Sequence, residues 1–217
     1  MSEAEARRQA LVEVYNQASV CERCPLSETR NRVVFGAGNA DADLMFVGEA
    51  PGAEEDRQGL PFVGRAGAFL TELLEGIGLK REDVFIANVL KCRPPGNRNP
   101  QPEEIDACRP YLEQQVQLIK PRVIATLGNF ATKLLTANPT GITKVRGTPQ
   151  QHLIGRRHVY LLPLFHPAAG LRTPRVAEQL REDFRQIPEL LAQPLPEPEP
   201  LVADRELEPD QMGLFSG

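Results

Sequence analysis

The four cysteines of this chain are spaced like the ligands of a metal site. Cys21 and Cys24 form a C-x2-C pair, and Cys92 and Cys108 follow with 15 residues between them. Thiols seldom form disulfides in a reducing cytosol, so the choice lies between buried free thiols and a metal, and the C-x2-C pair favours a metal. Structural zinc usually uses two close pairs, whereas iron–sulfur clusters tolerate looser spacing. The spacing alone therefore leaves zinc and iron open.

A carboxylate, an amide and an imidazole stand at the ends of apolar runs or inside them. These are Glu49, Asn88 and His166. Carboxylates and imidazoles can transfer protons, and a buried amide must be satisfied, so Asn88 either holds the protein together or recognises a ligand. A lone histidine is usually structural, which is our interpretation of His152 and His158. The position of His166, at a strand end before a proline, favours neither role over the other.

Glycines flank the segment around Glu49. Gly48 and Gly52 allow backbone amides to approach a ligand closely, but the pattern is neither a phosphate-binding loop nor a dinucleotide fingerprint. Taken alone, the motif favours an ordinary turn over a ligand site. Phe62 lies in a glycine-containing loop further along. It either packs in the core or forms a stacking platform for a base.

These residues are set in a regular alternation of apolar and amphipathic segments. The apolar, β-branched-rich runs are 44–48, 84–90, 123–127 and 159–165, and the amphipathic stretches are 3–18, 66–77, 102–119, 129–137 and 175–191. Nearly unbroken apolar strands that alternate with helices indicate a mostly parallel sheet covered on both faces. We therefore predict an α/β fold of three layers, α/β/α, around a central, mostly parallel four-stranded sheet. Its ligand should lie at the carboxyl ends of the strands.

Charge is distributed unevenly along the chain. The net charge is −4, but residues 193–217 hold six acids and one base, so that segment carries −5 and residues 1–192 carry +1. We expect 1–192 to form one domain, whose arginines are compatible with a local phosphate-binding face. The segment 193–217 is rich in proline and glutamate, and we expect it to be a disordered extension.

Signals for membrane insertion or export are missing from the sequence. No apolar run approaches the roughly 18 residues that a membrane span needs, and residues 1–8 lack the apolar core of a signal peptide. We expect a cytoplasmic protein that has no membrane partner and is a monomer.

Assembled in order, the motifs resemble the family 4 uracil-DNA glycosylases, the cluster-containing branch of the uracil-DNA glycosylase superfamily. The match extends from about Cys21 to Arg175. The matching segments are Cys21-Glu22-Arg23-Cys24, Val34-Phe35-Gly36, Gly48-Glu49-Ala50-Pro51-Gly52, Gly59-Leu60-Pro61-Phe62-Val63-Gly64, Asn88-Val89-Leu90-Lys91-Cys92-Arg93-Pro94-Pro95, Cys108-Arg109, Thr143-Lys144-Val145-Arg146-Gly147 and Phe165-His166-Pro167. So many short motifs in one order make coincidence implausible.

The resemblance implies an enzyme of DNA base excision repair. Such an enzyme flips uracil out of DNA and hydrolyses its N-glycosidic bond, leaving an abasic site. The resemblance further implies that Cys21, Cys24, Cys92 and Cys108 hold a [4Fe–4S] cluster. We also expect a monofunctional glycosylase, because no amine nucleophile stands among the residues matched to the site.

The resemblance assigns a role to each candidate site residue. Phe62 would stack on the flipped base, and the Asn88 amide would accept from uracil N3–H and donate to O4, the opposite of the pattern that suits cytosine. His166 would donate to O2 as the base leaves as an anion. Glu49 would position or activate water, or stabilise the cationic sugar.

The segment around Gly48 departs from the best-known branch of the superfamily. Backbone amides at Gly48 and Ala50 would contact the substrate. That branch has an aspartate two residues after the first glycine and a tyrosine two residues beyond it, where this chain has Ala50 and Gly52. The group that activates water and the filter against thymine must therefore differ. Glu49 is our hypothesis for the first, and the segment 54–56 is our hypothesis for the second.

Two further contacts with macromolecules are predicted. Leu171 and Arg172 match the loop that enters the duplex, where Leu171 would fill the vacated stack and Arg172 would hold a phosphate. Near its end the chain contains Gln211-Met212-Gly213-Leu214-Phe215, which resembles the bacterial pentapeptide that binds the sliding clamp. The alternative interpretation is a frayed terminus with two chance hydrophobic residues.

Two rival hypotheses remain for the function. One is a suicide relative that captures uracil-DNA through a histidine in an inserted basic loop, but the corresponding segment 93–100 is short and contains no histidine, which favours turnover. The other is a non-catalytic nucleic-acid-binding module. The coexistence of Glu49, Phe62, Asn88 and His166 argues against such a module, and a pocket too small for a base would argue for it.

Overall fold

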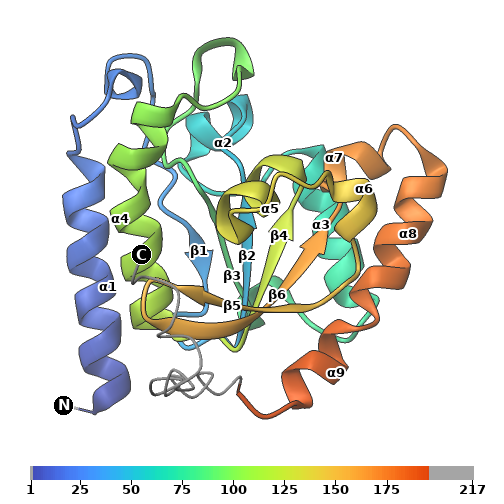
Figure 1. Ribbon diagram of the computed structural model, residues 1–217. Coiled ribbons are helices and arrows are strands. Elements are labelled where there is room, and N and C mark those ends of the chain that lie inside the picture. The colour runs from blue at the N-terminus through green and yellow to red at the C-terminus, as the bar shows by residue number, and fades with distance from the viewer. Residues whose placement is uncertain (1, 196–217) are drawn as a thin grey trace, which may run out of the picture.

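The computed structural model describes residues 2–195 and is built on one six-stranded sheet (Figure 1). The strands are β1 (Ala37–Gly38), β2 (Leu44–Gly48), β3 (Phe85–Asn88), β4 (Val123–Leu127), β5 (Gln150–Ile154) and β6 (Arg157–Leu164). Their order across the sheet is β1-β3-β2-β4-β6-β5. β2, β3, β4 and β6 run parallel to one another, and β1 and β5 are antiparallel strands at the two edges.

The predicted α/β fold with a mostly parallel sheet is confirmed, but the prediction of four strands was wrong. The four predicted strands are the inner ones. β1 has only two residues, and β5 has the polar sequence Gln-Gln-His-Leu-Ile, in which exposed residues alternate with partly buried ones. An edge strand with one solvated face lacks the unbroken apolar run by which an inner strand is recognised.

Helices cover both faces of the sheet. The helices are α1 (Glu3–Ser19), α2 (Ala53–Gln58), α3 (Arg65–Glu75), α4 (Pro102–Ile119), α5 (Asn129–Thr136), α6 (Ile142–Val145), α7 (Pro167–Gly170), α8 (Pro174–Phe184) and α9 (Ile187–Ala192). The predicted stretch 175–191 is divided between α8 and α9, which meet at Arg185 and Gln186. Within residues 2–195 no helix is both long and apolar enough to cross a bilayer.

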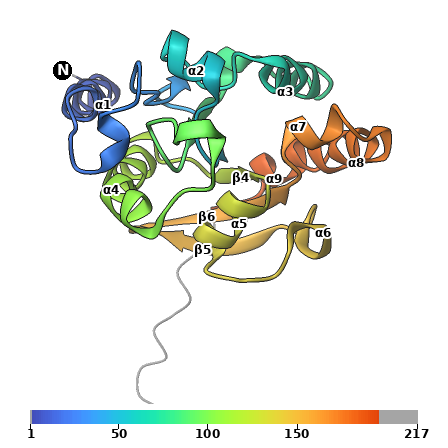
Figure 2. The ribbon, with the colours of Figure 1, turned by 90° about the horizontal axis from the view of Figure 1, so that it is seen from above.

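Alternate residues of the inner strands pack on opposite sides of the sheet. Met45 and Val47 contact the core formed with α1, α4 and α5, whereas Leu44 and Phe46 contact the core formed with α3, α8 and α9. Figure 2 shows α1 and α4 on one side of the sheet and α3 and α8 on the other. This arrangement explains the unbroken apolar runs, because each inner strand is buried on both faces. The three-layer prediction is confirmed.

The carboxyl ends of the parallel strands lie at one edge of the sheet. β2 ends at Gly48, and in the parallel register Gly48 pairs with Asn88 at the end of β3. β6 ends at Leu164, two residues before His166. The fold therefore brings three segments that are far apart in sequence to the same edge, which is where ligands bind in open α/β sheets.

Candidate active site

A cleft opens at this edge of the sheet and contains most of the predicted site residues. Its open space amounts to about 1160 Å³, and its lining includes Glu49, Ala50, Phe62, Asn88, His166 and Arg172. Gly48 is buried just below it, and Leu171 is an exposed neighbour of Arg172. The cleft is large enough to admit a base.

Gly48 lies where the end of β2 packs closely against Asn88 and the Phe62 ring. A Cβ atom at this position would overlap the Asn88 Oδ1 atom and lie 2.9 Å from Cζ of Phe62. Only a residue without a side chain leaves both groups in place. Gly48 therefore sets the spacing between the aromatic ring and the amide, which the sequence had assigned as two separate substrate contacts.

Phe62 is held in an uncommon backbone conformation. Its φ of 51° lies in the left-handed region, which non-glycine residues seldom adopt. The Glu55 carboxylate fixes the following turn, because its Oε1 accepts from the backbone N–H groups of Val63 and Gly64 at 3.0 and 3.1 Å. Gly67 in α3 lets the Phe62 backbone approach, since a Cβ there would overlap the Phe62 carbonyl.

Asn88 is 2% exposed, and its backbone is fixed on both sides. Its carbonyl accepts from Nζ of Lys91 at 2.8 Å, and the next N–H, of Val89, donates to the Gly48 carbonyl at 2.9 Å. Within residues 2–195 no protein group hydrogen-bonds its side-chain amide, which lines the cleft. An amide that reaches the cleft on a buried residue is suited to recognise a ligand.

His166 is a neutral hydrogen-bond donor in this cleft. It caps the amino terminus of α7, where its Nδ1 accepts from the backbone N–H of Ala168 at 3.1 Å. Burial lowers the pKa of His166 to about 4, so the ring is neutral at pH 7. Because Nδ1 accepts, the single proton lies on Nε2. The ring also stacks on Phe62, with centroids 5.6 Å apart and planes inclined by 27°.

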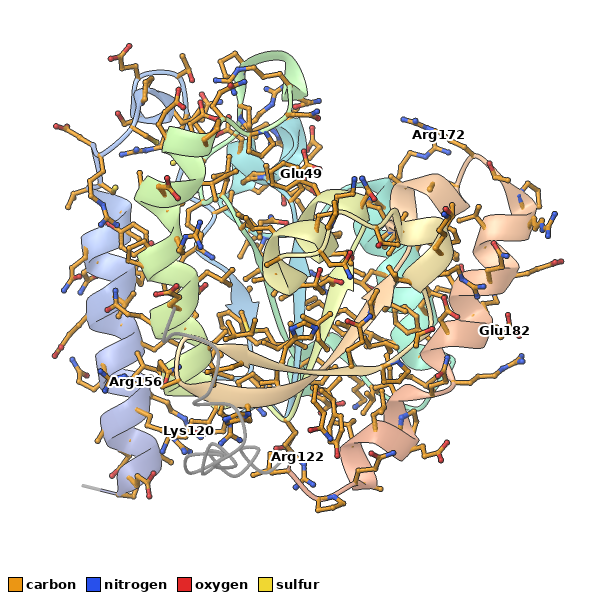
Figure 3. The ribbon with its side chains drawn as sticks, in the orientation of Figure 1. Glu49, Lys120, Arg122, Arg156, Arg172 and Glu182 are labelled. Carbon is orange, nitrogen blue, oxygen red and sulfur yellow. The ribbon has the colours of Figure 1, made fainter. Side chains whose placement is uncertain are left out.

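Glu49 follows β2 directly and lies half-buried in the cleft. Burial raises the pKa of its carboxyl group. Figure 3 shows Glu49 and Arg172 at the same end of the molecule, opposite to Lys120, Arg122 and Arg156. Arg172 is exposed and follows Leu171, whose side chain is 40% exposed. The cleft thus has an acidic group inside and a basic group beside an apolar one on its rim.

Of the segment 54–56, our hypothesis for the filter against thymine, only Glu55 lines the cleft.

Several other lining residues were not assigned from the sequence. Pro94 and Asn97 line it too, as does Arg98, whose guanidinium makes a bidentate ion pair with Glu104 at 2.5 and 2.9 Å. The family motif that contains Cys92 includes Pro94, so the sequence identified this segment as part of the family pattern. It did not predict that the segment lines the cleft.

All four cysteines line a second, small cavity. It lies between the end of α1, the segment after β3 and α4, with an empty volume of about 280 Å³. Burial raises the pKa of Cys92 to about 12 and also raises the pKa of Cys108. Within residues 2–195, no three Cys, His, Asp or Glu side chains are placed to hold a single metal ion. The four predicted ligands are thus brought together at one place in the fold.

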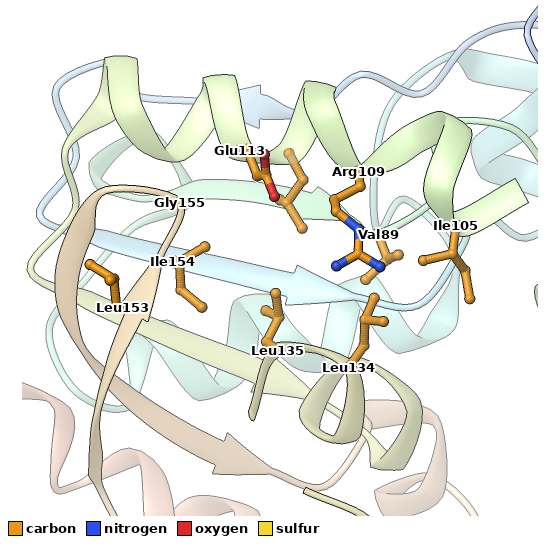
Figure 4. Close-up of a pocket in the computed structure, with 10 residues that line it drawn as sticks. Val89, Ile105, Arg109, Glu113, Leu134, Leu135, Leu153, Ile154 and Gly155 are labelled. Atoms are coloured by element: carbon orange, nitrogen blue, oxygen red, sulfur yellow. The ribbon is translucent and has the colours of Figure 1, made fainter. Parts of the chain in front are cut away.

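A third cavity, of about 560 Å³, lies between α4, α5 and the β5–β6 turn (Figure 4). It is lined mainly by aliphatic side chains such as Leu134 and Leu135, with Arg109 and Glu113 on the α4 side. It contains none of the predicted site residues. The candidate active site is therefore the cleft at the strand ends.

The comparisons agree with this fold. The family model of the uracil DNA glycosylase superfamily matches residues 35–191. The chain belongs to the uracil-DNA glycosylase superfamily.

Within that superfamily, the chain is similar to Type-4 uracil-DNA glycosylases. The protein of Sulfurisphaera tokodaii is 44% identical over 85% of this chain and 86% of its own length. The protein of Archaeoglobus fulgidus is 43% identical over 87% of this chain and 96% of its own length. The protein of Thermotoga maritima is 48% identical over 76% of this chain and 85% of its own length. The resemblance drawn from the sequence motifs is confirmed.

The shifted pKa of His166 predicts a pH-dependent stability. The unfolded imidazole titrates near pH 6.5, and the folded one at about 4. Between these values the unfolded chain binds more protons, so this contribution is fully present above about pH 6.5 and is lost as the pH falls toward 4. Chemical denaturation should show that the wild type loses about 2 kcal/mol more than His166→Gln over this interval. If the free energy of unfolding fell equally with pH in the two proteins, the lowered pKa of His166 would be contradicted.

Proposed function

We propose that this chain flips uracil out of DNA and hydrolyses its glycosidic bond, leaving an abasic site. The observation that carries the proposal is the cleft in which a stacked Phe62–His166 pair faces an unpaired Asn88 amide. A base inside a duplex must be extruded before such groups can reach it. Membership of the superfamily supports the same activity.

Recognition of uracil is assigned to Asn88 and Phe62. The Asn88 amide accepts from N3–H and donates to O4, which requires that the amide keep one orientation. Cytosine offers an acceptor and a donor in the reverse places, so it would leave buried polar groups unpaired, at a cost of several kcal/mol. Phe62 supplies the flat surface on which the base stacks.

Departure of the base is assigned to His166. As the bond breaks, negative charge develops on uracil O2, and the neutral Nε2–H donates to that oxygen. The tautomer set by the Ala168 N–H supports this role. A preorganised donor of this kind contributes about 3–4 kcal/mol to the transition state. Glu49 lies on the same cleft and is assigned to the attacking water or to the cationic sugar.

A single hydrolytic step is favoured over capture or strand cutting. No lysine lines the cleft within the described chain, and the Lys91 ammonium is buried behind Asn88. An amine that attacks the sugar is therefore lacking at the site. The segment 93–100 also offers no histidine for covalent capture. A non-catalytic module is disfavoured by a cleft that can contain a base.

Leu171 and Arg172 are assigned to the DNA duplex. Both side chains are exposed on the segment that follows His166 and α7. Leu171 would occupy the space that the flipped base vacates, and Arg172 would bind a phosphate.

A labelled uracil-containing oligonucleotide, followed by alkali, tests the proposed activity. Wild-type protein should release uracil and leave an alkali-labile site. Asn88→Ala and His166→Ala should each slow single-turnover excision by about 100-fold or more, since each loses a contact to the base that strengthens in the transition state. His152→Ala, on the edge strand β5, is the matched control and should be unaffected.

Two results would contradict the assignment. If both variants excised uracil at near-wild-type rates with saturating enzyme, the assignment of Asn88 and His166 to the active site would be wrong. A covalent enzyme–DNA adduct trapped by borohydride would replace simple hydrolysis with amine chemistry.

We further propose that Cys21, Cys24, Cys92 and Cys108 hold a [4Fe–4S] cluster. Their position around one small cavity supports a shared ligand site, and the resemblance of the cysteine motifs to those of the cluster-containing family favours iron–sulfur over zinc. Donors to sulfur are also present: Lys91 N–H lies 3.4 Å from Cys108 Sγ, and Arg30 Nη1 lies 3.7 Å from Cys92 Sγ. Such hydrogen bonds accompany thiolate-bound clusters. When bound, the cluster would link α1, α4 and the segment 92–108, which includes Pro94, Asn97 and Arg98 of the cleft.

Iron analysis tests the four-cysteine site. Cys108→Ser should lower both iron content and visible absorbance, and should lower thermal stability, because ligand binding contributes to folding free energy. Cys21→Ser, on a different element, should do the same. Unchanged iron and absorbance after either substitution would exclude a four-cysteine cluster, while zinc in the wild type would change the metal and leave the glycosylase proposal intact.

We also propose that the segment Gln211-Met212-Gly213-Leu214-Phe215 binds the sliding clamp. It lies outside the described residues, so the proposal rests on its sequence. Leu214 and Phe215 would fill an apolar pocket and Gln211 would add a directional hydrogen bond. The tether would raise the concentration of enzyme at newly made DNA. We also propose a cytoplasmic location, which a DNA substrate and a sliding clamp would both require.

Binding of purified clamp to the full-length chain tests this tether. Replacing both Leu214 and Phe215 by Ala should abolish binding, since these side chains supply the apolar contact. Replacing Leu201 and Val202, also in the tail, by Ala is the matched control and should preserve it. Equal binding by the Leu214/Phe215 variant, or none by the wild type, would reject the tether.

A further inference from the structure

Lys91 is a buried lysine without a role in the chemistry proposed above. It is 1% exposed and follows β3, between Asn88 and Cys92. Its Nζ donates to the Asn88 carbonyl at 2.8 Å and to Gln115 Oε1 at 2.6 Å. Gln115 lies in α4 and is itself fixed, because its Nε2 donates to the Phe35 carbonyl at 2.8 Å. The ammonium group is therefore held in one place by neutral acceptors.

The other side of Lys91 faces the cysteines. Lys91 lines the four-cysteine cavity, and its backbone N–H donates to Cys108 Sγ at 3.4 Å. Within residues 2–195 its ammonium group donates to the Asn88 and Gln115 oxygens, and no carboxylate pairs with it. Lys91 thus contacts both Asn88, at the end of β3, and the four-cysteine cavity.

A buried ammonium is costly unless an opposite charge compensates it, so an apolar residue would serve packing better. Four thiolates around an iron–sulfur cluster carry net negative charge, which would supply that compensation. The Asn88–Val89 peptide is then fixed from two sides, by Lys91 at its carbonyl and by Gly48 at its N–H. A fixed peptide determines the direction in which the Asn88 side chain leaves the backbone.

We propose that Lys91 is a positioning residue that couples the four-cysteine site to uracil recognition by Asn88. This inference rests on the proposed cluster and the proposed role of Asn88. Its consequence is reciprocal, because two coupled sites must each change the affinity of the other by the same factor. Uracil in the cleft should stabilise the bound cluster, and Lys91 should be required for that effect.

The first test measures binding of free uracil to Lys91→Met, as inhibition of excision and by direct titration. Methionine keeps the length and apolar stem of lysine but cannot donate to the Asn88 carbonyl. The Asn88 amide then loses its fixed direction, so free uracil should bind about tenfold more weakly, the size expected for loss of one hydrogen bond to the base. Lys120→Met, an exposed lysine at the opposite end of the sheet, should bind uracil normally. Gln115→Leu removes the other acceptor and should weaken uracil binding in the same direction, which gives a second variant if Lys91→Met folds poorly.

The second test measures loss of visible absorbance in the presence of an iron chelator, with and without saturating uracil. In the wild type, uracil should slow the loss several-fold, and in Lys91→Met it should have no effect. A purely structural lysine would speed the loss equally with and without uracil and leave the uracil affinity of folded protein unchanged, which would overturn the proposal. A wild type without iron would overturn the cluster and this coupling together, whereas iron with no effect of uracil would overturn the coupling alone.

Discussion

The close packing at Gly48 is the constraint on which the site depends. Parallel register places Gly48 beside Asn88, and the Phe62 ring closes over the same point, leaving no room for a side chain. Phe62 reaches this position only through a left-handed backbone, which Glu55 and Gly67 support from two directions. Close backbone packing therefore determines the geometry of the cleft, and the three-layer core beneath it stabilises that packing.

The electrostatics of the cleft follow from the same packing. Burial keeps His166 neutral, and the amino terminus of α7 decides which nitrogen bears the proton. Asn88 is left with an amide that no described protein group occupies, on a backbone that Lys91 and Gly48 hold. Neutral donors and acceptors fixed in this way are suited to pair with the edge of a base, which is the role proposed for them.

The sequence predicted what depends on burial of whole segments and on motif chemistry. The sequence predicted the inner strands β2, β3, β4 and β6 because they are apolar on both faces. It predicted the cysteines and the strand-end residues because their residue types and spacing are typical of metal and ligand sites. The edge strands β1 and β5 were missed because half of each is solvated. The support of Phe62 by Glu55, the tautomer of His166 and the contacts of Lys91 could not be predicted, since each arises between segments that meet only after folding.

The central claim is that contact at Gly48 sets the geometry that excises uracil, and Gly48→Ala measures it most directly. Its single-turnover excision rate should be determined together with its free energy of unfolding. We predict a protein that remains folded, with excision slowed by about 100-fold or more, because displacing a reacting group by about 1 Å has an effect of that size. A folded Gly48→Ala protein that excises uracil within about twofold of the wild-type rate, a change of only about 0.4 kcal/mol in the barrier, would contradict the account.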